Sequence, residues 1–291
     1  MFHSAITGAI PPLAVPLRRP HGFSALPFHR QRDIIQQRSY LDDSGRAYQV
    51  PLQYALGEEV IVAPVYSPLS CGPENCTDGN ATVDVWLPPT HSWVAFPSLH
   101  HGGSYTNAAS VFNGSTTMQA VHCQLDDVPV FVRRGAILPM LPYSVAIRHG
   151  SAARPWGTLD LWWYPHVDRQ STSTSTLVED DGMSTDYLDG QGVLTTSIVI
   201  DYMDAHCTRW NITHEGSAFV GMPQRRRTSL RVVDAADVAP HPLPSTVTLN
   251  GHLLPESASK RVAGDRYAGP GLTIALPALG YMQDVVVIVC S

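Results

Sequence analysis

The 291-residue sequence contains little charge and no long hydrophobic run. Charged residues make up 15% of the chain, below the roughly 25% of an average soluble protein, and the net charge is −6. A negative net charge argues against nucleic acid or an anionic membrane as the main partner. The longest late apolar run, Val285–Cys290, has the length of one buried strand. We therefore expect no transmembrane helix.

Several sequence motifs that are typical of catalytic, cofactor-binding or metal-binding sites are also missing. The sequence has no P-loop, no G-x-G-x-x-G segment, no G-x-S-x-G elbow and no C-x-x-C pair, and its histidines are scattered. It therefore predicts no cofactor and no metal site. The first residues lack a basic stretch before an apolar core, and Pro11 and Pro12 interrupt the only apolar run, so they do not form a secretion signal.

Glycine (22) and proline (24) are abundant, which favours many short strands over long helices. From Val60 onward the chain alternates strand-like runs with turns, and the Asn250-Gly251 pair between two such runs predicts a type I′ hairpin. This spacing predicts a mainly β fold with two consecutive β-sandwich domains. The expected strands lie at 60–65, 82–87, 92–96, 118–125, 129–132, 136–138, 159–164, 175–178, 193–201, 208–214, 229–233, 247–249, 252–254, 272–275 and 285–290.

Residues 1–57 differ from the rest, because only Asp33–Arg38 and Val50–Leu56 could form helical turns. So little apolar periodicity cannot build a core, and we expect this segment to pack on another part of the protein. A connector at Ser144–Gly157 separates the two strand sets. The predicted domains are therefore 1–57, 58–150 and 151–291.

Four of the six asparagines begin an N-x-Ser/Thr sequon: Asn75, Asn80, Asn113 and Asn211. They are candidates for N-glycosylation and favour a secretory, lysosomal or extracellular location, although coincidence in a Ser/Thr-rich chain remains an alternative. Cys71 and Cys76 flank a short loop and could close a small disulfide. We expect Cys123, Cys207 and Cys290 to be buried thiols within strands.

Acidic residues occur in adjacent groups at Asp42-Asp43, Glu58-Glu59, Asp126-Asp127 and Glu179-Asp180-Asp181. Neighbouring strand residues point to opposite faces, so one group cannot easily present two carboxylates to a sugar. We expect solvated turn or surface charges and no catalytic residue. Calcium binding by the last group is the alternative. The six tryptophans could stack on sugars, but core packing is the more usual role of aromatic residues in strands.

The order of several motifs resembles glycoside hydrolase family 31, the α-glucosidase and α-xylosidase family. Gln53–Val65 resembles its "QYxLGxxxLVAPV" segment, and Val85–Pro89 with Trp93 resembles "VWLPPGxW", although Thr90-His91-Ser92 stands where a glycine is usual. Gly102-Gly103 matches the turn that follows.

The most specific match is Asp127–Pro139, which resembles "xIPVFVRxGxIIP". Leu177–Tyr187 resembles the "LYEDDGxSxxY" segment and Val247–Gly251 the "VxVNG" hairpin of the distal C-terminal domain. Within Asp127–Pro139, we expect Arg133 or Arg134 to reach a carboxylate across an interdomain surface.

The resemblance implies that the catalytic aspartates of the family lie on a (β/α)₈ barrel upstream of every motif present here. Residues 1–57 would then be a short remnant of the end of that barrel. The sequence is interpreted as the non-catalytic C-terminal region of an enzyme that acts on O-glycosidic bonds of α-linked sugars, inactive by itself. Its carbohydrate substrate would be bound through an upstream barrel or a barrel on a partner chain. The alternative is a non-enzymatic carbohydrate-binding or scaffold β-sandwich protein.

Overall fold

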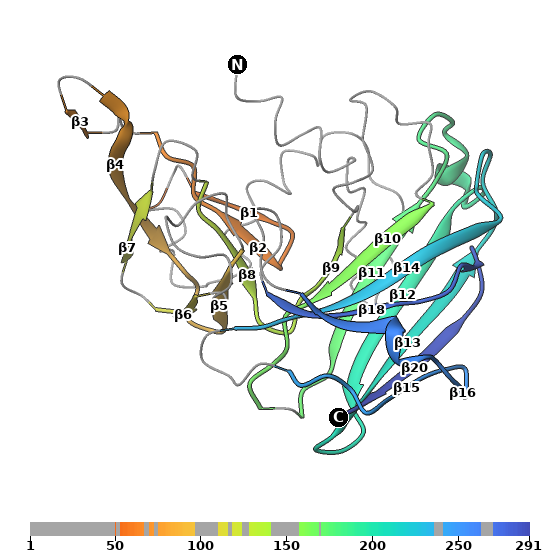
Figure 1. Cartoon of the computed structure of the whole chain (residues 1–291). Coiled ribbons are helices and arrows are strands. Elements are labelled where there is room, and N and C mark those ends of the chain that lie inside the picture. The colour runs from red at the N-terminus through yellow and green to blue at the C-terminus, as the bar shows by residue number, and fades with distance from the viewer. Residues whose placement is uncertain are drawn as a thin grey trace.

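The computed structural model describes residues 50, 53–66, 70–72, 75–96, 110–115, 118–123, 128–140, 157–168, 170–235, 241–262 and 270–291. These residues form β-strands and two short 3₁₀ turns, Asp186–Asp189 and Glu256–Ala258, with no α-helix among them (Figure 1). The predicted mainly β fold is confirmed. The proposed barrel remnant and Asp33–Arg38 lie outside the described residues.

The N-terminal half contributes two sheets. The first sheet has the order β3-β4-β7, with β3 at Ser70–Gly72, β4 at Asn75–Trp86 and β7 at Met118–Cys123. The second sheet has the order β1-β2-β8-β5-β6. Its strands are β1 (Tyr54–Leu56), β2 (Val60–Val62), β5 (Ser92–Ala95), β6 (Val111–Asn113) and β8 (Val130–Arg133).

The C-terminal half contributes two larger sheets. The third sheet has the order β17-β18-β14-β10-β9, with β19 also paired to β14, and β10 and β14 run parallel. Its strands are β9 (Ile137–Met140), β10 (Thr158–Trp163), β14 (Arg225–Val233), β17 (Ser259–Val262), β18 (Gly271–Ala275) and β19 (Leu279–Gly280).

The fourth sheet has the order β11-β12-β13-β20-β15-β16. Its strands are β11 (Ser173–Glu179), β12 (Leu194–Tyr202), β13 (Cys207–Gly216), β15 (Thr246–Leu249), β16 (His252–Leu253) and β20 (Val285–Cys290). Burial alternates strictly along β20 and most of β12, because one side of each strand faces another sheet and the other side faces outward.

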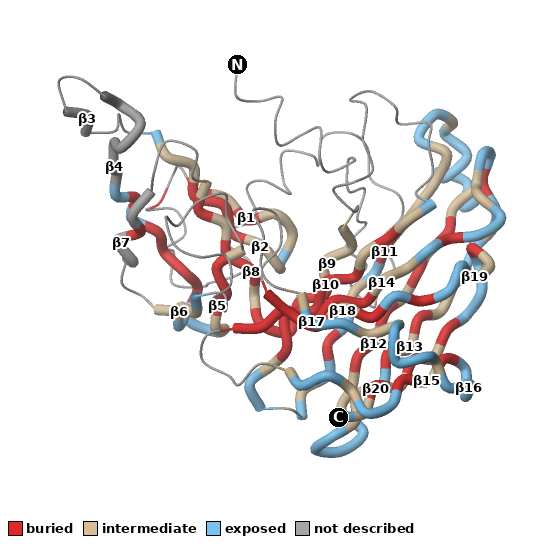
Figure 2. Tube along the Cα trace, viewed as in Figure 1, coloured by how far each residue is buried: buried red, intermediate tan, exposed pale blue. Residues whose placement is uncertain are grey.

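Three apolar clusters join the four sheets face to face, and Figure 2 shows the buried segments running along the strands that form them. Val85, Trp93 and Phe131 belong to the cluster between the first and second sheets. Val132, Trp162 and Val233 belong to the cluster between the second and third sheets. The largest cluster lies between the third and fourth sheets and includes Trp163, Trp210, Leu230 and Val287.

The Asn250-Gly251 turn confirms the predicted hairpin. Both residues have positive φ, 49° and 81°, and Leu249 pairs with His252 across the turn. By contrast, the expectation of a helical turn at Val50–Leu56 is wrong for its last three residues. Tyr54–Leu56 is a strand because Gly57, at φ 64°, reverses the chain and allows Leu56 to pair with Val60.

Two strand pairings cross the predicted domain limits at residues 57 and 150. Strands β1 and β2 pair across residue 57, and β9 pairs with β10, so residues on both sides of 150 share the third sheet. The domain limits 1–57, 58–150 and 151–291 remain a proposal. None of the described helical segments is long and apolar enough to cross a membrane.

Candidate functional site

The turn between β8 and β9 carries the most specific sequence motif. Arg133 donates two side-chain hydrogen bonds of 3.0 and 2.7 Å from Nη2 to the Glu59 carboxylate, and its Nε donates a third of 3.1 Å. Both partners lie within the second sheet, on β8 and beside β2. Arg133 therefore does reach a carboxylate, as the sequence suggested, but within one sheet.

The next two residues of this turn dock on the end of β10. Arg134 is buried and donates from Nη1 to the carbonyl of Pro165 at 3.0 Å. Gly135, at φ 86°, donates its backbone N–H to the carbonyl of Tyr164 at 2.6 Å. The turn thus carries the chain from the second sheet to the third, and Arg134 and Gly135 both donate hydrogen bonds to carbonyls that follow β10.

A buried charged cluster lies at one end of the two C-terminal sheets. Glu179 ends β11, Arg226 lies in β14 and Tyr281 follows β19. The Arg226 guanidinium pairs with the Glu179 carboxylate and covers the Tyr281 ring at 3.8 Å from its centroid. The Tyr281 hydroxyl accepts from Arg226 and donates to Glu179 at 2.8 Å. The side chains of Glu179 and Arg226 are only 9% and 5% exposed.

This cluster corrects the interpretation of Glu179 as a turn or surface charge. Glu179 follows Leu177 at the two-residue spacing of a strand, so both side chains point toward the interior. An isolated carboxylate there would be costly, and Arg226 compensates its charge. Burial is the main cause that raises the pKa of the Tyr281 hydroxyl, so it stays protonated and donates to the carboxylate.

A small, partly open pocket with a cavity volume of about 30 Å³ adjoins the cluster. Apolar side chains from both sheets form most of its wall, among them Leu159, Ile212 and Val285, and the polar contribution comes from Thr196, His214, Arg226, Thr228, Tyr281 and Gln283. Burial lowers the pKa of His214, although the nearby carboxylate of Asp284, 3.3 Å from Nδ1, opposes the shift. The wall is thus largely apolar, and burial favours the neutral form of the His214 imidazole in it.

The other two carboxylates of this acidic segment stabilise a turn, as expected. Asp180 accepts from the backbone N–H of Gly182 at 2.7 Å, and Asp181 accepts from those of Met183 and Ser184 at 3.0 and 2.9 Å. The backbone hydrogen bonds hold the pKa of Asp181 below its usual value. The described residues contain no group of three or more His, Cys, Asp or Glu side chains placed to hold a metal ion. Asp42-Asp43 and Asp126-Asp127 fall outside the described part.

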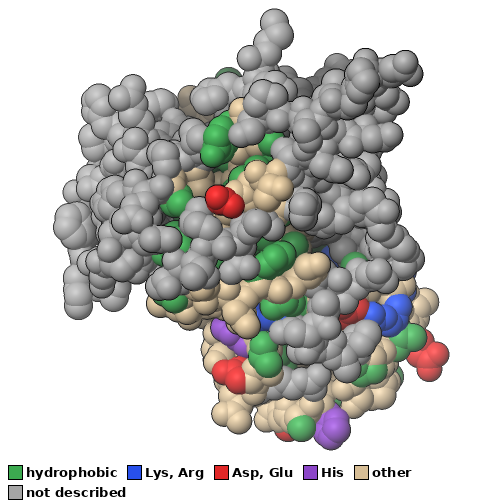
Figure 3. Space-filling view, turned by 90° about the vertical axis from the view of Figure 1, so that its left-hand side faces the viewer, with side chains coloured by type: hydrophobic (Ala, Val, Ile, Leu, Met, Phe, Trp, Pro, Cys, Tyr) green, Lys and Arg blue, Asp and Glu red, His purple; other side chains and the backbone are tan. Residues whose placement is uncertain are grey.

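The tryptophans occupy the core. Trp86, Trp93, Trp163 and Trp210 are at most 2% exposed and Trp162 is 6% exposed, so none of these five offers a free face for a sugar. Trp162 stacks with the Phe96 ring, with the ring centroids 5.8 Å apart, and the Arg231 guanidinium lies over Trp162 at 4.9 Å from its centroid. Trp156 lies outside the described residues. On the face drawn in Figure 3 the described charged side chains form no single large patch.

Two predicted modification sites can be located. Asn113 ends β6 and is exposed, and Asn211 lies in β13 with a partly exposed side chain. The backbones of Asn75 and Asn80 belong to β4, but their side chains, like those of Cys71, Cys76 and Cys123, lie outside what the structure describes.

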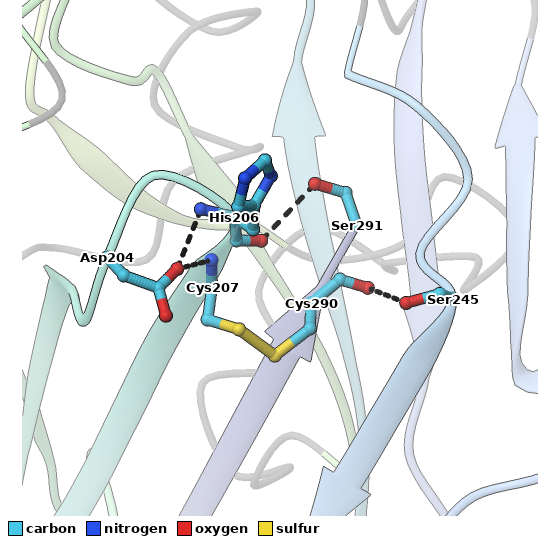
Figure 4. The surroundings of a disulfide bond; sticks show 6 residues. All are labelled: Asp204, His206, Cys207, Ser245, Cys290 and Ser291. Carbon is cyan, nitrogen blue, oxygen red and sulfur yellow. Dashed lines mark hydrogen bonds between the residues drawn. A yellow bond between two sulfur atoms is a disulfide. The ribbon is translucent and has the colours of Figure 1, made fainter.

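The expectation that Cys207 and Cys290 are buried free thiols is wrong. They form a disulfide between the paired strands β13 and β20, with a Cα–Cα distance of 4.1 Å (Figure 4). The two residues are 83 positions apart and pair directly across the sheet. Their spacing in the sequence therefore gave no sign of the bond.

Comparison with known proteins agrees with the resemblance seen in the sequence. Residues 37–138 match the model of the glycosyl hydrolase family 31 C-terminal domain. Over 149 residues the chain is 28% identical to an α-xylosidase of Saccharolobus solfataricus, which corresponds to 51% of this chain and 16% of that protein.

Solved structures of the same family share the fold. A GH31 dextranase of Flavobacterium johnsoniae complexed with glucose superposes with a TM-score of 0.62 at 18% identity, over 89% of this chain and 29% of that one. A GH31 α-xylosidase of Xanthomonas citri superposes with a TM-score of 0.55 at 19% identity, over 88% and 22%. The chain thus spans less than a third of the length of these relatives, and the predicted likeness to the C-terminal part of family 31 proteins is confirmed.

Proposed function

Since residues 37–138 match the C-terminal domain of glycosyl hydrolase family 31, we propose that this chain is a non-catalytic C-terminal region of a family-31-like glycoside hydrolase. The complete enzyme would act on O-glycosidic bonds of α-linked sugars, in carbohydrate metabolism. The observation that carries the proposal is that the residues of the family motifs have structural roles in this fold. Trp86, Trp93 and Phe131 fill the core, and the turn at 133–135 joins the second sheet to the third.

The carboxylates support a non-catalytic role. Glycoside hydrolysis needs two carboxyl groups roughly 5–10 Å apart across the scissile bond, one of them free to act as an acid. In the described acidic groups, Glu59 is bound by Arg133, Glu179 by Arg226, and Asp180 and Asp181 by backbone amides. The catalytic pair would come from a (β/α)₈ barrel, either in the same protein or on a partner chain.

The buried tryptophans favour this proposal over a carbohydrate-binding module. Such a module would present an exposed aromatic ring to the sugar, whereas five of the six tryptophans lie in the core. A scaffold that supports a catalytic domain needs no such exposed ring.

The test is to express residues 1–291 and assay them with aryl α-glucosides and α-xylosides. We expect no turnover, and the Asp180→Ala and Asp181→Ala variants serve as controls at the acidic turn that follows β11. Turnover that either substitution abolishes would contradict the proposal, because the turn would then be an active site. Supplying a family 31 barrel that lacks its own C-terminal domains should restore activity only in the presence of this chain.

A further inference from the structure

The outward side of the fourth sheet has an asparagine near its centre. Asn211 lies in β13, which pairs with β12 on one side and β20 on the other. Its direct cross-strand partners are Val199 and Val286. Its chain neighbours Trp210 and Ile212 are buried in the core, so Asn211 points to the opposite, outward side. The strands β13, β20, β15 and β16 lie in the lower right part of the molecule in Figure 1.

The surroundings of Asn211 are half-buried and aliphatic. Val199, Val286 and Ile288 are all partly exposed on this outward side, because they alternate with core residues along β12 and β20. Two positions away along these strands lie the charged residues Arg209 on β13 and Asp201 on β12. They are already paired with each other, since Arg209 donates to Asp201 at 3.1 and 2.6 Å. Among the described residues, the Asn211 amide makes no side-chain hydrogen bond. A polar group without a partner thus stands between aliphatic side chains.

The residue two positions on completes the sequon. Thr213 follows Asn211 and Ile212 on the same strand, so it shares the outward side with Asn211 and is also partly exposed. Asn113, the other sequon asparagine with a described side chain, lies at the end of β6 and accepts a 3.5 Å hydrogen bond from Ser92. Of these two described asparagines, Asn211 is the one with aliphatic cross-strand partners on both sides.

A second feature of this outward side points to the compartment in which the sugar would be added. Cys207 lies four residues before Asn211 on β13, and its disulfide to Cys290 joins the same two strands. Disulfides persist in oxidising compartments such as the lumen of the endoplasmic reticulum. N-x-Ser/Thr sequons are glycosylated in secreted proteins, so the two features agree.

We propose that Asn211 carries an N-linked glycan that covers the aliphatic side chains of its cross-strand partners Val199 and Val286 and of the nearby Ile288. In the modification, a bond forms between Asn211 Nδ2 and the first sugar carbon of a lipid-diphosphate-linked oligosaccharide. The bond between that sugar and the lipid diphosphate breaks, the amide nitrogen loses a proton, and the lipid diphosphate leaves. The bulky, hydrated glycan shields these aliphatic side chains from other proteins.

The test is to direct the complete 291-residue chain through the secretory pathway of a eukaryotic host. Treatment with a peptide N-glycosidase in ¹⁸O-water, followed by peptide mapping, should convert Asn211 to labelled aspartate. Thr213→Val should remove this label while keeping a β-branched residue in the strand, and Thr213→Ser should retain it. All three proteins should give the same circular dichroism spectrum and keep the Cys207–Cys290 cross-link, which excludes misfolding as the cause.

The shielding is tested separately. The Thr213→Val protein should bind more of a hydrophobic dye and form more soluble aggregate than the Thr213→Ser protein at equal concentration. An unlabelled Asn211 in the secreted wild-type chain, whatever the state of Asn113, overturns the proposal. A glycan at Asn211 together with unchanged dye binding and aggregation in Thr213→Val overturns the covering role.

Discussion

The imidazole ring of His166 occupies the space in which a side chain at position 135 would begin. A Cβ atom built on Gly135 would lie 2.1 Å from His166 Nε2, closer than any non-bonded contact allows. Gly135 also has φ 86°, in the region that favours glycine. The glycine and the histidine therefore fix how the turn after β8 docks on the end of β10, and with it how the second sheet meets the third.

Gly135→Ala should lower the free energy of unfolding by about 3 kcal/mol or more, because backbone strain and overpacking act together. Gly57→Ala is a matched control, since Gly57 also has positive φ but nothing lies within 4 Å of its added Cβ. The control should cost only about 1–2 kcal/mol. Urea denaturation measures both. Equal losses in the two variants would show that the contact with His166 contributes nothing.

The stability of the contact between the turn after β8 and the end of β10 should also depend on pH. Burial lowers the pKa of His166; the nearby Asp168 opposes the shift, and Arg133 and Arg134 add to it. The folded protein therefore favours the neutral ring, and the unfolded chain takes up more protons as the pH falls through about 6.5. The contribution of His166 is present above that value and is lost as the pH falls toward the lowered folded pKa.

Measured urea midpoints should therefore decrease between about pH 7.5 and 5.5, the range around the ordinary histidine value. His166→Gln should make that decrease shallower. It should leave a residual slope, because burial lowers the pKa of His91 in the same direction. A wild-type midpoint that rises on acidification would contradict the predicted direction.

Arg226→Met should destabilise the protein by about 3–5 kcal/mol, because it leaves the buried Glu179 carboxylate without its compensating charge. Arg227→Met is a matched control on the same strand, where the side chain is exposed, and should change stability by less than about 0.5 kcal/mol. Adding Glu179→Gln to Arg226→Met should recover part of the loss. If the double variant is no more stable than Arg226→Met alone, the ion pair is not the source of the effect.

Much of the fold could be predicted because alternation along a strand is a local signal. The predicted strand at 285–290 coincides with β20, and the hairpin at Asn250-Gly251 follows from the backbone that these two residues accept. Tyr54–Leu56 was mistaken for a helical turn because a three-residue strand is too short to show a period. Its pairing with β2 decides its conformation.

The buried cluster was missed for a different reason. Glu179 begins an acidic run, and such a run is typical of a turn, but Glu179 also shares the inward side of β11 with Leu177. That alternation was the available signal. Arg226, its partner, lies 47 residues further on, and only the packing of the third sheet on the fourth brings them together.

The Cys207–Cys290 disulfide should contribute about 4–5 kcal/mol, because it closes a loop of 83 residues in the unfolded chain. Cys207→Ser, Cys290→Ser and the double variant should lose the same amount, since each removes the Cys207–Cys290 cross-link. Reduction should lower the urea midpoint of the wild-type protein by more than that of the double variant, because only the wild-type protein has the Cys207–Cys290 bond to lose. Peptide mapping without reduction should recover both cysteines in one cross-linked species. Separate alkylated peptides from a protein made in an oxidising compartment would contradict the bond and remove its support for glycosylation at Asn211.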